Sequence, residues 1–420
     1  MNLITESFDY ISAQSSASIL SLFALVIIFE IPRYLALFLV AAFFERPRQQ
    51  PLDVSFRRSV AVIVAGHNEA ESFPRCVDSL MEQSRPPDQI IAFSDGSTDG
   101  TPQVLRDLLA KGKIHNAMWT DLRGGKSAGF NICQRMATCD LIVNIDCDCS
   151  LDRDAIRRIV EPFDDPEIGG VAGNIQVRNA DASLIAACQA IEYMITISLG
   201  KQAALVFDQV TCASGGYSAF RRSALEQIGG NDAGGGEDLD ATLRLRAYGW
   251  KIGFRSDSVC YTDVPDTVAA LVRQRFRWER DAVRLRFRKY SYAMNPFHPQ
   301  FRVSELAHQL EFLIFNILGA SILPFYIVWL FYQFGSHAFV ILLSVKILLM
   351  IIDFYVFILA AMCTPHVNSL KLFPFILAYN FYNGLFMRCV RLAAYVDEWI
   401  FKSSYKDSYV PQKVHDVRGG

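Results

Sequence analysis

A short apolar run that ends in two carboxylates constrains the fold of this chain most. Residues 141–145 (Leu-Ile-Val-Asn-Ile) are typical of a strand buried in a parallel sheet, and Asp146 and Asp148 follow at its end. In an open α/β sheet, ligands bind beyond the carboxyl ends of the strands. Two carboxylates there repel each other unless a cation lies between them. The run therefore predicts a Mg²⁺ or Mn²⁺ site that also holds substrate phosphates. The alternative is an acidic turn, because Asp favours turns.

Strand and helix patterns alternate through the middle of the chain. The predicted strands cover residues 59–65, 89–93, 116–119 and 140–146, and the predicted helices cover 70–82, 102–110 and a stretch after Ser127. Repeated strand–helix units imply a mainly parallel sheet with right-handed crossovers. The polar, glycine-rich loops that follow these strands are then expected to converge on one crevice.

Several of these loops suit a nucleotide. Asp95 follows a strand directly and is placed to accept hydrogen bonds from a uracil ring or a ribose, and Lys126 offers a point charge for a diphosphate. The alternative for residues 94–101 is a set of capping residues at the start of a helix.

Two glycine-rich loops follow a predicted long helix at 182–206. Gly215 and Gly216 would let the backbone approach a ligand closely, although an ordinary turn before a strand is an equal alternative. Glu237 and Asp238 stand at the start of a helix predicted at 241–248. They either complement the helix dipole or supply a carboxylate that takes a proton from an acceptor hydroxyl.

Apolar segments at both ends predict a membrane protein. One segment covers residues 19–44, with a kink expected at Pro32, and three more cover 310–334, 338–363 and 372–394. The basic residues after the first segment place the N-terminus outside and the middle of the chain in the cytosol; they are Arg46, Arg48, Arg57 and Arg58. Four spans put the tail outside, whereas Arg388 and Arg391 favour the inside, so the alternative is that the last apolar stretch lies partly in the membrane interface. Lys346 and Asp353 within a span predict either a polymer path or a structural ion pair.

Net charge and cysteine content limit the functions and the cellular compartments that fit this chain. A net charge of −2 gives no indication of nucleic-acid binding. The ten cysteines form no paired framework, which fits free thiols in a reducing compartment.

Residues 269–288 combine arginines with interleaved apolar residues, a pattern that favours a helix lying in the inner membrane interface. Within it, the indole of Trp278 offers a platform for a sugar ring, and Gln274 and Arg277 offer hydrogen-bond donors.

Taken in order, these motifs resemble the membrane-embedded processive glycosyltransferases of family 2, the group of cellulose, chitin, hyaluronan and poly-N-acetylglucosamine synthases. The motifs that carry the resemblance are Ser94-Asp95-Gly96-Ser97-Thr98-Asp99-Gly100-Thr101, Asp146-x-Asp148, Gly236-Glu237-Asp238 and Gln274-x-x-Arg277-Trp278.

The resemblance implies an α/β fold: a GT-A-like, mainly parallel sheet domain inserted between transmembrane helices. The expected boundaries are an N-terminal helix at 1–50, a cytosolic domain at 51–265, interfacial helices at 266–306, membrane helices at 307–400 and a tail at 401–420. The expected location is the inner (plasma) membrane of a bacterium.

The resemblance also implies roles for individual residues. Asp238 is the general base, Asp146 and Asp148 hold the metal, and Gly215, Gly216, Glu237, Gln274, Arg277 and Trp278 contact the acceptor. The nucleotide-sugar is expected at Glu69, Asp95, Lys126 and Asp146.

The expected reaction is inverting transfer of a sugar from a UDP-sugar to a growing β-linked glycan, and coupling to translocation across the membrane is an extension of this expectation. Two alternatives stay open. One is transfer of a single sugar to a lipid-linked acceptor, and the other is an export component without catalysis.

Overall fold

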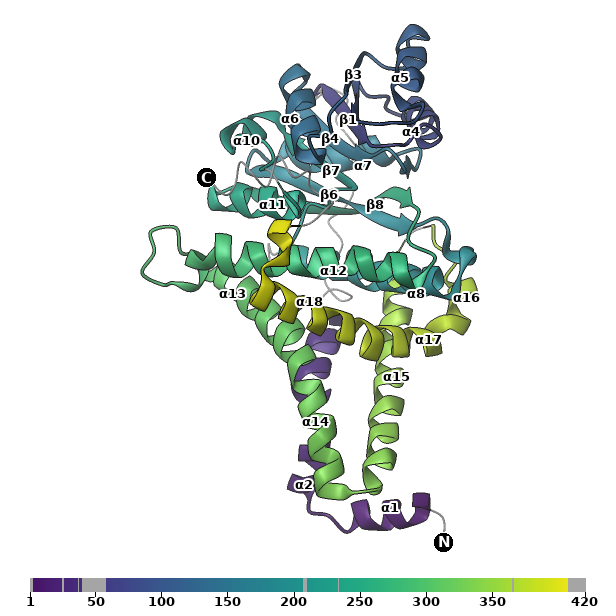
Figure 1. Ribbon diagram of the computed structural model, residues 1–420, viewed down its shortest axis with the longest axis vertical. Helices are drawn as coiled ribbons and strands as arrows, with labels where there is room; N and C mark the ends of the chain where they lie inside the picture. The colour runs from purple at the N-terminus through teal and green to yellow at the C-terminus, as the bar shows by residue number, and fades with distance from the viewer. Residues whose placement is uncertain are drawn as a thin grey trace.

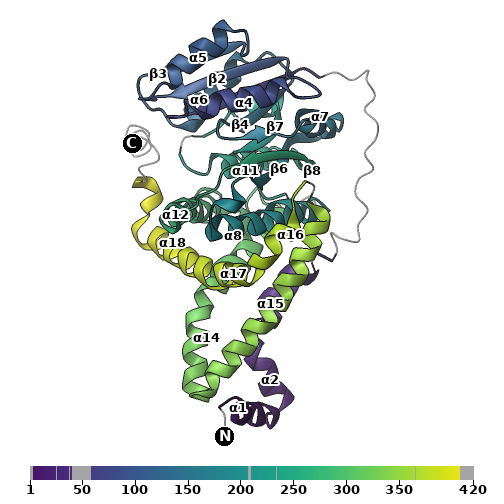
Figure 2. The same ribbon diagram turned by 90° about the vertical axis from the view of Figure 1, so that its right-hand side faces the viewer.

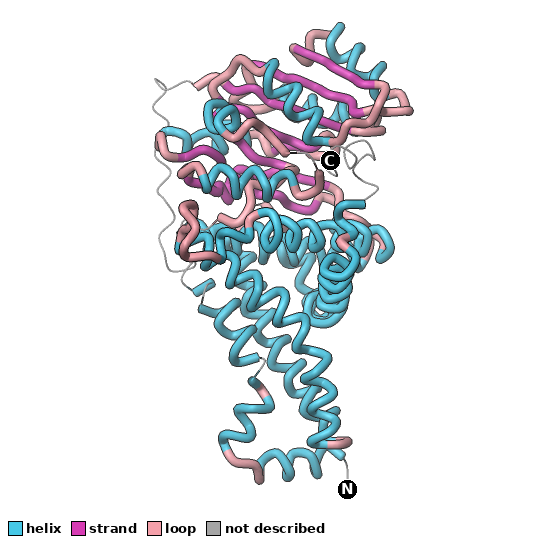
Figure 3. The backbone as a smooth tube through the Cα atoms, turned by 60° about the vertical axis from the view of Figure 1, so that its left-hand side comes forward, coloured by secondary structure: helices cyan, strands magenta, loops and turns pink. Residues whose placement is uncertain are grey.

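The computed structural model describes residues 3–24, 26–36, 38–39, 58–206, 210–232, 234–364 and 366–406. Figure 1 shows three levels: a domain with the sheet at one end, a layer of helices that cross beneath it, and a group of long helices at the other end. All strands lie in the first level, and the remainder is helical (Figure 3). Arg46, Arg48 and Arg57, on which the predicted orientation rests, lie outside the described residues, as does the tail beyond 406.

The sheet has eight strands in the order β3-β2-β1-β4-β7-β6-β8-β5. Their bounds are β1 Val60–Gly66, β2 Gln89–Asp95, β3 Asn116–Thr120, β4 Leu141–Asp146, β5 Ser150–Leu151, β6 Ile168–Val177, β7 Tyr217–Arg221 and β8 Lys251–Thr262. The first four pair in parallel, as predicted, whereas β7 runs antiparallel to both β4 and β6. The mainly parallel α/β fold is confirmed.

Helices cover both faces of the sheet. They are α4 Ser72–Met81, α5 Thr101–Ala110, α6 Lys126–Met136, α7 Ala155–Val160, α10 Arg222–Gln227 and α11 Glu237–Ala247. Because both faces are covered, alternate residues of one strand enter different cores. Val60, Val62 and Val64 of β1 join one cluster, and Ala61 and Ile63 join the other. Helix α11 begins at Glu237, four residues before its predicted start, so Glu237 and Asp238 lie in its first turn.

The crossing layer is built from segments far apart in sequence. The predicted long helix at 182–206 is α8 Leu184–Tyr193, the π-helical turn η4 Met194–Leu199 and α9 Gly200–Val206. The interfacial segment at 269–288 is α12 Val268–Arg284 with η5 Leu285–Lys289. Helices α17 Ile376–Phe381 and α18 Met387–Phe401, joined by η9 Tyr382–Phe386, run beside α8 and α12 (Figures 1 and 2).

Two helices are long and apolar enough to cross a membrane, Val303–Phe334 and His337–Cys363. The first combines α13 Val303–Glu311, η7 Phe312–Leu318 and α14 Gly319–Phe334, and the second is α15. Between α15 and α17 lie α16 Ser369–Leu372 and η8 Phe373–Phe375. The third C-terminal span predicted at 372–394 is wrong, because this stretch is divided among short helices of the crossing layer.

The N-terminal apolar segment also differs from the prediction. Helix α1 Leu3–Ser12 precedes α2 Ser16–Leu22, and α2 meets η1 Val26–Ala36 at an angle of 65°. The bend lies before η1, whereas the expected kink site Pro32 lies inside η1. This pair raises the number of candidate spans among the described residues to three at most.

The charged residues of the apolar segments bind other helices. Glu30 pairs with Arg388 of α18, and Arg33 donates a hydrogen bond to Asn316 Oδ1 at 3.3 Å. Lys346 Nζ donates to the carbonyl of Asn380 at 3.0 Å, and the Asn380 amide donates to Asp353 at 2.6 Å. Lys346 and Asp353 therefore fasten α15 to α17, which agrees with the structural alternative for this pair.

This arrangement predicts the side on which the tail lies. Since α18 runs beside α12, a reporter fused after residue 420 should be on the same side of the membrane as one inserted in the exposed 111–113 turn of the domain that contains the sheet (Figure 1). Protease protection in sealed, oriented vesicles measures this. Digestion of one reporter and protection of the other would contradict the placement of α18.

Candidate active site

Asp146 and Asp148 lie at the carboxyl end of β4, at the predicted edge of the sheet. Lys126 Nζ, at the start of α6, donates to Asp146 Oδ1 at 2.5 Å. Burial and the adjacent charge of Asp146 raise the pKa of Asp148 to about 6. The strand end therefore holds a pair of carboxylates that Lys126 neutralises only in part.

Gly215 is the point where the predicted residues meet. Its carbonyl accepts hydrogen bonds from Lys126 Nζ at 2.9 Å and from Asn144 Nδ2 at 2.6 Å, and its N–H donates to Asp238 Oδ2 at 2.9 Å. A Cβ atom at this position would lie 3.3 Å from Lys126 Nζ and 3.4 Å from both Asp238 Oδ2 and Glu237 Oε1. The site therefore closes around a residue without a side chain.

The acidic residues of α11 enter this group from the other side. The Glu237 carboxylate lies 3.6 Å from Lys126 Nζ, and burial raises the pKa of Glu237. The carbonyl of Gly216 accepts a hydrogen bond from the Asp146 N–H of β4 at 3.1 Å. Four residues that lie far apart in the sequence therefore form one site: Lys126, Asp146, Gly215 and Glu237.

Asp95 lies beside this group at the end of β2. Its two carboxylate oxygens accept hydrogen bonds from the N–H groups of Gly124 and Gly125, at 2.6 and 2.8 Å. Asp95 therefore fixes the loop that leads into Lys126. Each oxygen keeps a further lone pair, so contact with a base or ribose stays a prediction.

The rest of the 94–101 loop supports the capping alternative. Asp99 Oδ1 accepts from the Thr101 N–H at 2.9 Å, and Thr101 Oγ1 accepts from the Glu69 N–H at 2.9 Å. The Glu69 carboxylate adds to the negative field at the strand ends, because its charge contributes to the raised pKa of the buried Cys147 thiol.

The carboxylate pair fits a hard divalent cation. Within the described residues no group of three or more His, Cys, Asp or Glu side chains forms a complete metal cage. Mg²⁺ and related ions are commonly held by one or two carboxylates, with water and substrate phosphates completing the shell. Asp146 and Asp148 supply that minimal donor set. The ten cysteines are all free, as predicted.

A comparison with known families decides what kind of domain this is. Residues 61–229 match the family described as Glycosyl transferase family 2. The chain carries a family 2 glycosyltransferase domain.

The curated relatives of this chain are named as bacterial polysaccharide synthases. It is 28% identical over 279 residues to a poly-beta-1,6-N-acetyl-D-glucosamine synthase of Staphylococcus epidermidis, covering 66% of this chain and 64% of the relative. It is 27% identical over 235 residues to the protein of that name from Staphylococcus aureus strain COL, covering 55% of this chain and 56% of the relative. The chain thus spans between about half and two thirds of the relatives' length.

A solved structure shares the fold. It is a mannosyltransferase from Pyrobaculum calidifontis in complex with GDP-Man and Mn²⁺, with a TM-score of 0.59 and 20% identity. The likeness covers 91% of this chain and 99% of that one. At this identity it shows the fold alone, and it supports the GT-A-like assignment.

The glycosyltransferase domain rests on α12, which carries the remaining predicted residues. The Trp278 ring is 38% exposed and packs against the Arg275 guanidinium at 4.6 Å. Gln274 Oε1 is buried with no hydrogen-bond partner in the described part of the chain. Helix α12 approaches the acidic group at Gly235, whose carbonyl accepts from Arg284 at 2.6 Å. The acceptor roles of Gln274, Arg277 and Trp278 stay predictions.

Sequence reasoning missed several residues of the glycosyltransferase. Lys201 is buried on α9, its Nζ donates to Ser214 Oγ, and burial lowers its pKa. A single lysine inside an apolar helix is the sequence pattern that could have indicated Lys201. Glu192 is buried on α8 and binds Arg275 at 2.7 Å and the Tyr382 hydroxyl at 2.8 Å. No local pattern indicates the latter, because its partners are 83 and 190 positions away.

Proposed function

We propose that this protein is an inverting hexosyltransferase that moves a sugar from a UDP-sugar to a growing β-linked glycan, with N-acetylglucosamine as the first sugar to test. The observation that carries the proposal is the meeting of Lys126, Asp146, Glu237 and Asp238 around Gly215. The names of the curated relatives supply the choice of sugar. An intact set of this kind also argues against an export component without catalysis.

The residues divide the reaction between them. Asp238 accepts the proton of the acceptor hydroxyl as that oxygen attacks the anomeric carbon, and UDP departs from the opposite face. The ammonium of Lys126 stabilises the charge that develops on the leaving diphosphate. Asp238 Oδ2 accepts from the Gly215 N–H at 2.9 Å and Asp238 Oδ1 accepts from the Leu239 N–H at 2.8 Å, and each oxygen keeps a further lone pair that can receive the proton.

A divalent cation at Asp146 and Asp148 would supply further neutralisation of the diphosphate. The protein holds these two carboxylates close together at the end of β4. Burial and this closeness raise the pKa of Asp148. Lys126 alone does not balance Asp146, Asp148 and Glu237, which is why we include Mg²⁺ or Mn²⁺ in the proposal.

The acceptor and its location complete the proposal. The acceptor end would lie against Trp278, with the catalytic domain in the cytosol and α17 and α18 in the inner membrane interface. Exposed apolar side chains on these two helices suit that position; they include Leu377, Phe381, Trp399 and Ile400. We extend the proposal to translocation of the product across the membrane, since the same chain joins the site to spanning helices.

We expect release of UDP from UDP-N-acetylglucosamine by the purified full chain to require Mn²⁺ or Mg²⁺. Chelation with EDTA should lower turnover at least 100-fold, and added Mn²⁺ should restore it, because the diphosphate charge is otherwise uncompensated. UDP-glucose, UDP-galactose and UDP-glucuronate serve as competing donors. Product sizing separates a polymer from a single transfer to a lipid. Full turnover in EDTA would contradict the proposed metal requirement. No turnover with any donor would contradict the proposed transferase activity.

A further inference from the structure

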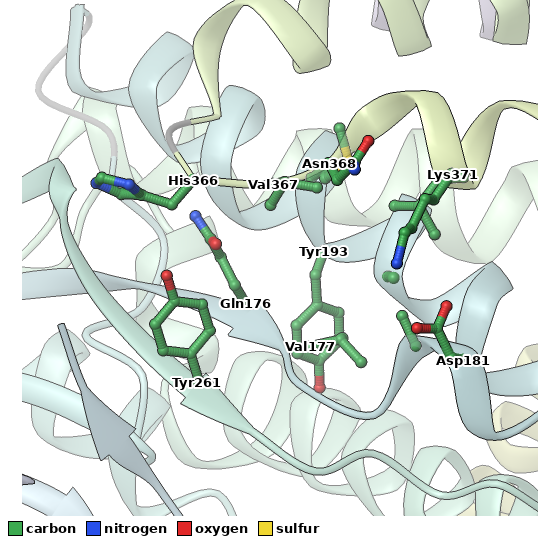
Figure 4. A pocket seen from close by; sticks show the side chains of 13 residues that line it. Gln176, Val177, Asp181, Tyr193, Tyr261, His366, Val367, Asn368 and Lys371 are labelled. Carbon is green, nitrogen blue, oxygen red and sulfur yellow. The ribbon is translucent and has the colours of Figure 1, made fainter.

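A cavity of about 200 Å³ lies where the catalytic domain meets the membrane helices, outside the site described above. Its walls come from β6, β8 and α8 on one side and from residues 366–372, after α15, on the other. The polar side chains that line it are Gln176, Asp181, Tyr193, Tyr261, His366, Asn368 and Lys371 (Figure 4).

Several of these polar groups have no partner within the protein. In the described part of the chain, the structure gives no side-chain hydrogen bond or ion pair to the Tyr261 hydroxyl, the Asn368 amide or the Lys371 ammonium, nor to the hydroxyl of Tyr193. Tyr193 is only 7% exposed, and a buried tyrosine hydroxyl usually finds a partner. The unused donors and acceptors therefore face the cavity.

The sheet fixes one wall of this cavity. Gln176 of β6 and Tyr261 of β8 are direct partners in the parallel register of the two strands, so their side chains leave the sheet on the same side. Figure 4 shows them together at one end, with Lys371 and Asp181 pointing toward each other at the other end. Two phenol rings lie between the amide of Gln176 and two side chains of opposite charge, so the wall is neutral and can form hydrogen bonds (Figure 4).

The cavity is connected to the acceptor end of the site through Tyr193. The Arg275 guanidinium lies 5.9 Å from the Tyr193 ring and 4.6 Å from the Trp278 ring. Burial, with the charges of Glu192 and Asp148 nearby, raises the pKa of Tyr193 to about 12. Trp278 and the cavity thus flank one arginine, and a chain of sugars that extends from Trp278 would meet Tyr193 next.

We propose that this cavity is a second glycan subsite, which binds one or two sugar units of the acceptor behind the unit that reacts. This rests on the proposed function. Its volume is below the roughly 300–1,000 Å³ of pockets for drug-sized ligands, which suits single pyranose rings. An isolated phosphate is disfavoured because Asp181 faces Lys371 across the mouth, and an acyl chain would bury the hydroxyls and amides without partners.

The test uses the full chain in nanodiscs and a β-1,6-linked N-acetylglucosamine trisaccharide as the probe. Tyr261→Phe removes one hydroxyl, and Asn368→Ala removes an amide from an exposed loop where folding is not at risk. Each should weaken trisaccharide binding roughly 3- to 10-fold, the effect of one lost hydrogen bond, while UDP release without the trisaccharide stays unchanged. Tyr248→Phe, at a tyrosine that is 57% exposed, is the matched control and should bind like the wild type.

The outcomes separate this inference from the proposed function. If the wild type turns over UDP-N-acetylglucosamine but neither variant changes trisaccharide binding, the cavity is not a glycan subsite. If the variants instead weaken binding of phosphatidylglycerol in the nanodisc, the cavity holds lipid and the inference is overturned. If trisaccharide binds and responds to both variants but no donor is turned over, the proposed function fails and the subsite stands.

Discussion

Asp238→Asn should abolish sugar transfer and leave the fold unchanged. An amide of the same shape still accepts one of the two backbone hydrogen bonds, from the Gly215 or the Leu239 N–H, but it cannot take a proton from the acceptor hydroxyl. A positioned general base contributes about 10²- to 10⁴-fold, so we expect kcat to fall by at least 100-fold. UDP release from the purified variant with Mn²⁺ measures this.

The control for this variant is Asp266→Asn, which removes an exposed carboxylate from the loop after β8. It should retain full turnover. The unfolding temperature of the Asp238 variant and its affinity for UDP should match those of the wild type, because Lys126 and Asp146 are untouched. Turnover of Asp238→Asn within a few-fold of the wild type would show that another group is the base.

Glu192→Gln should destabilise the protein by about 3 kcal/mol or more, the usual effect of breaking a buried ion pair. The carboxylate is 4% exposed and accepts hydrogen bonds from Arg275 and Tyr382, which belong to α12 and η9. Loss of its charge leaves the Arg275 guanidinium buried without compensation. The unfolding temperature in detergent and the free energy of unfolding measure the effect.

Two further variants test whether the lost stability comes from the buried ion pair. Asp78→Asn breaks a pair whose side chains are 41% and 49% exposed, and it should change the free energy of unfolding by less than about 1 kcal/mol. The triple variant Glu192→Leu, Arg275→Met and Tyr382→Phe removes every member of the buried set, so it should recover much of the lost stability. A Glu192→Gln protein as stable as the wild type would show that this contact does not hold the layer together.

The charged residues that follow Trp278 in the sequence bind other segments of the crossing layer and the loop before α11. Glu279 accepts hydrogen bonds from Arg391 at 3.2 Å and from the Tyr395 hydroxyl at 2.7 Å, both on α18. Asp281 pairs with Arg284 at 3.1 Å beside Gly235. The charged run after the indole therefore joins α12 to α18 and to the loop that precedes α11.

The same contacts explain why the predicted third span is wrong. Hydropathy alone permits a span at 372–394, but Arg388 and Arg391 are buried in ion pairs with Glu30 and Glu279. A helix through the bilayer core would have to bury these charges in hydrocarbon. In the crossing layer, Glu279 of α12 and Glu30 of η1 supply the counter-ions of α18.

The sequence by itself determined the parallel core of the sheet, the loops at its carboxyl edge and two of the long apolar helices, because strand periodicity and hydropathy are local properties. It also placed Asp95, Lys126, Asp146 and Asp238 in one crevice, since the ends of parallel strands share an edge. Only the tertiary structure decided that the Gly215 backbone binds both Lys126 and Asp238. It alone also decided that Glu192 and Lys201 are buried beneath these residues and that α18 lies beside α12. Those outcomes depend on which buried charge finds which partner, and the partners lie too far apart in the chain for any local pattern to name them.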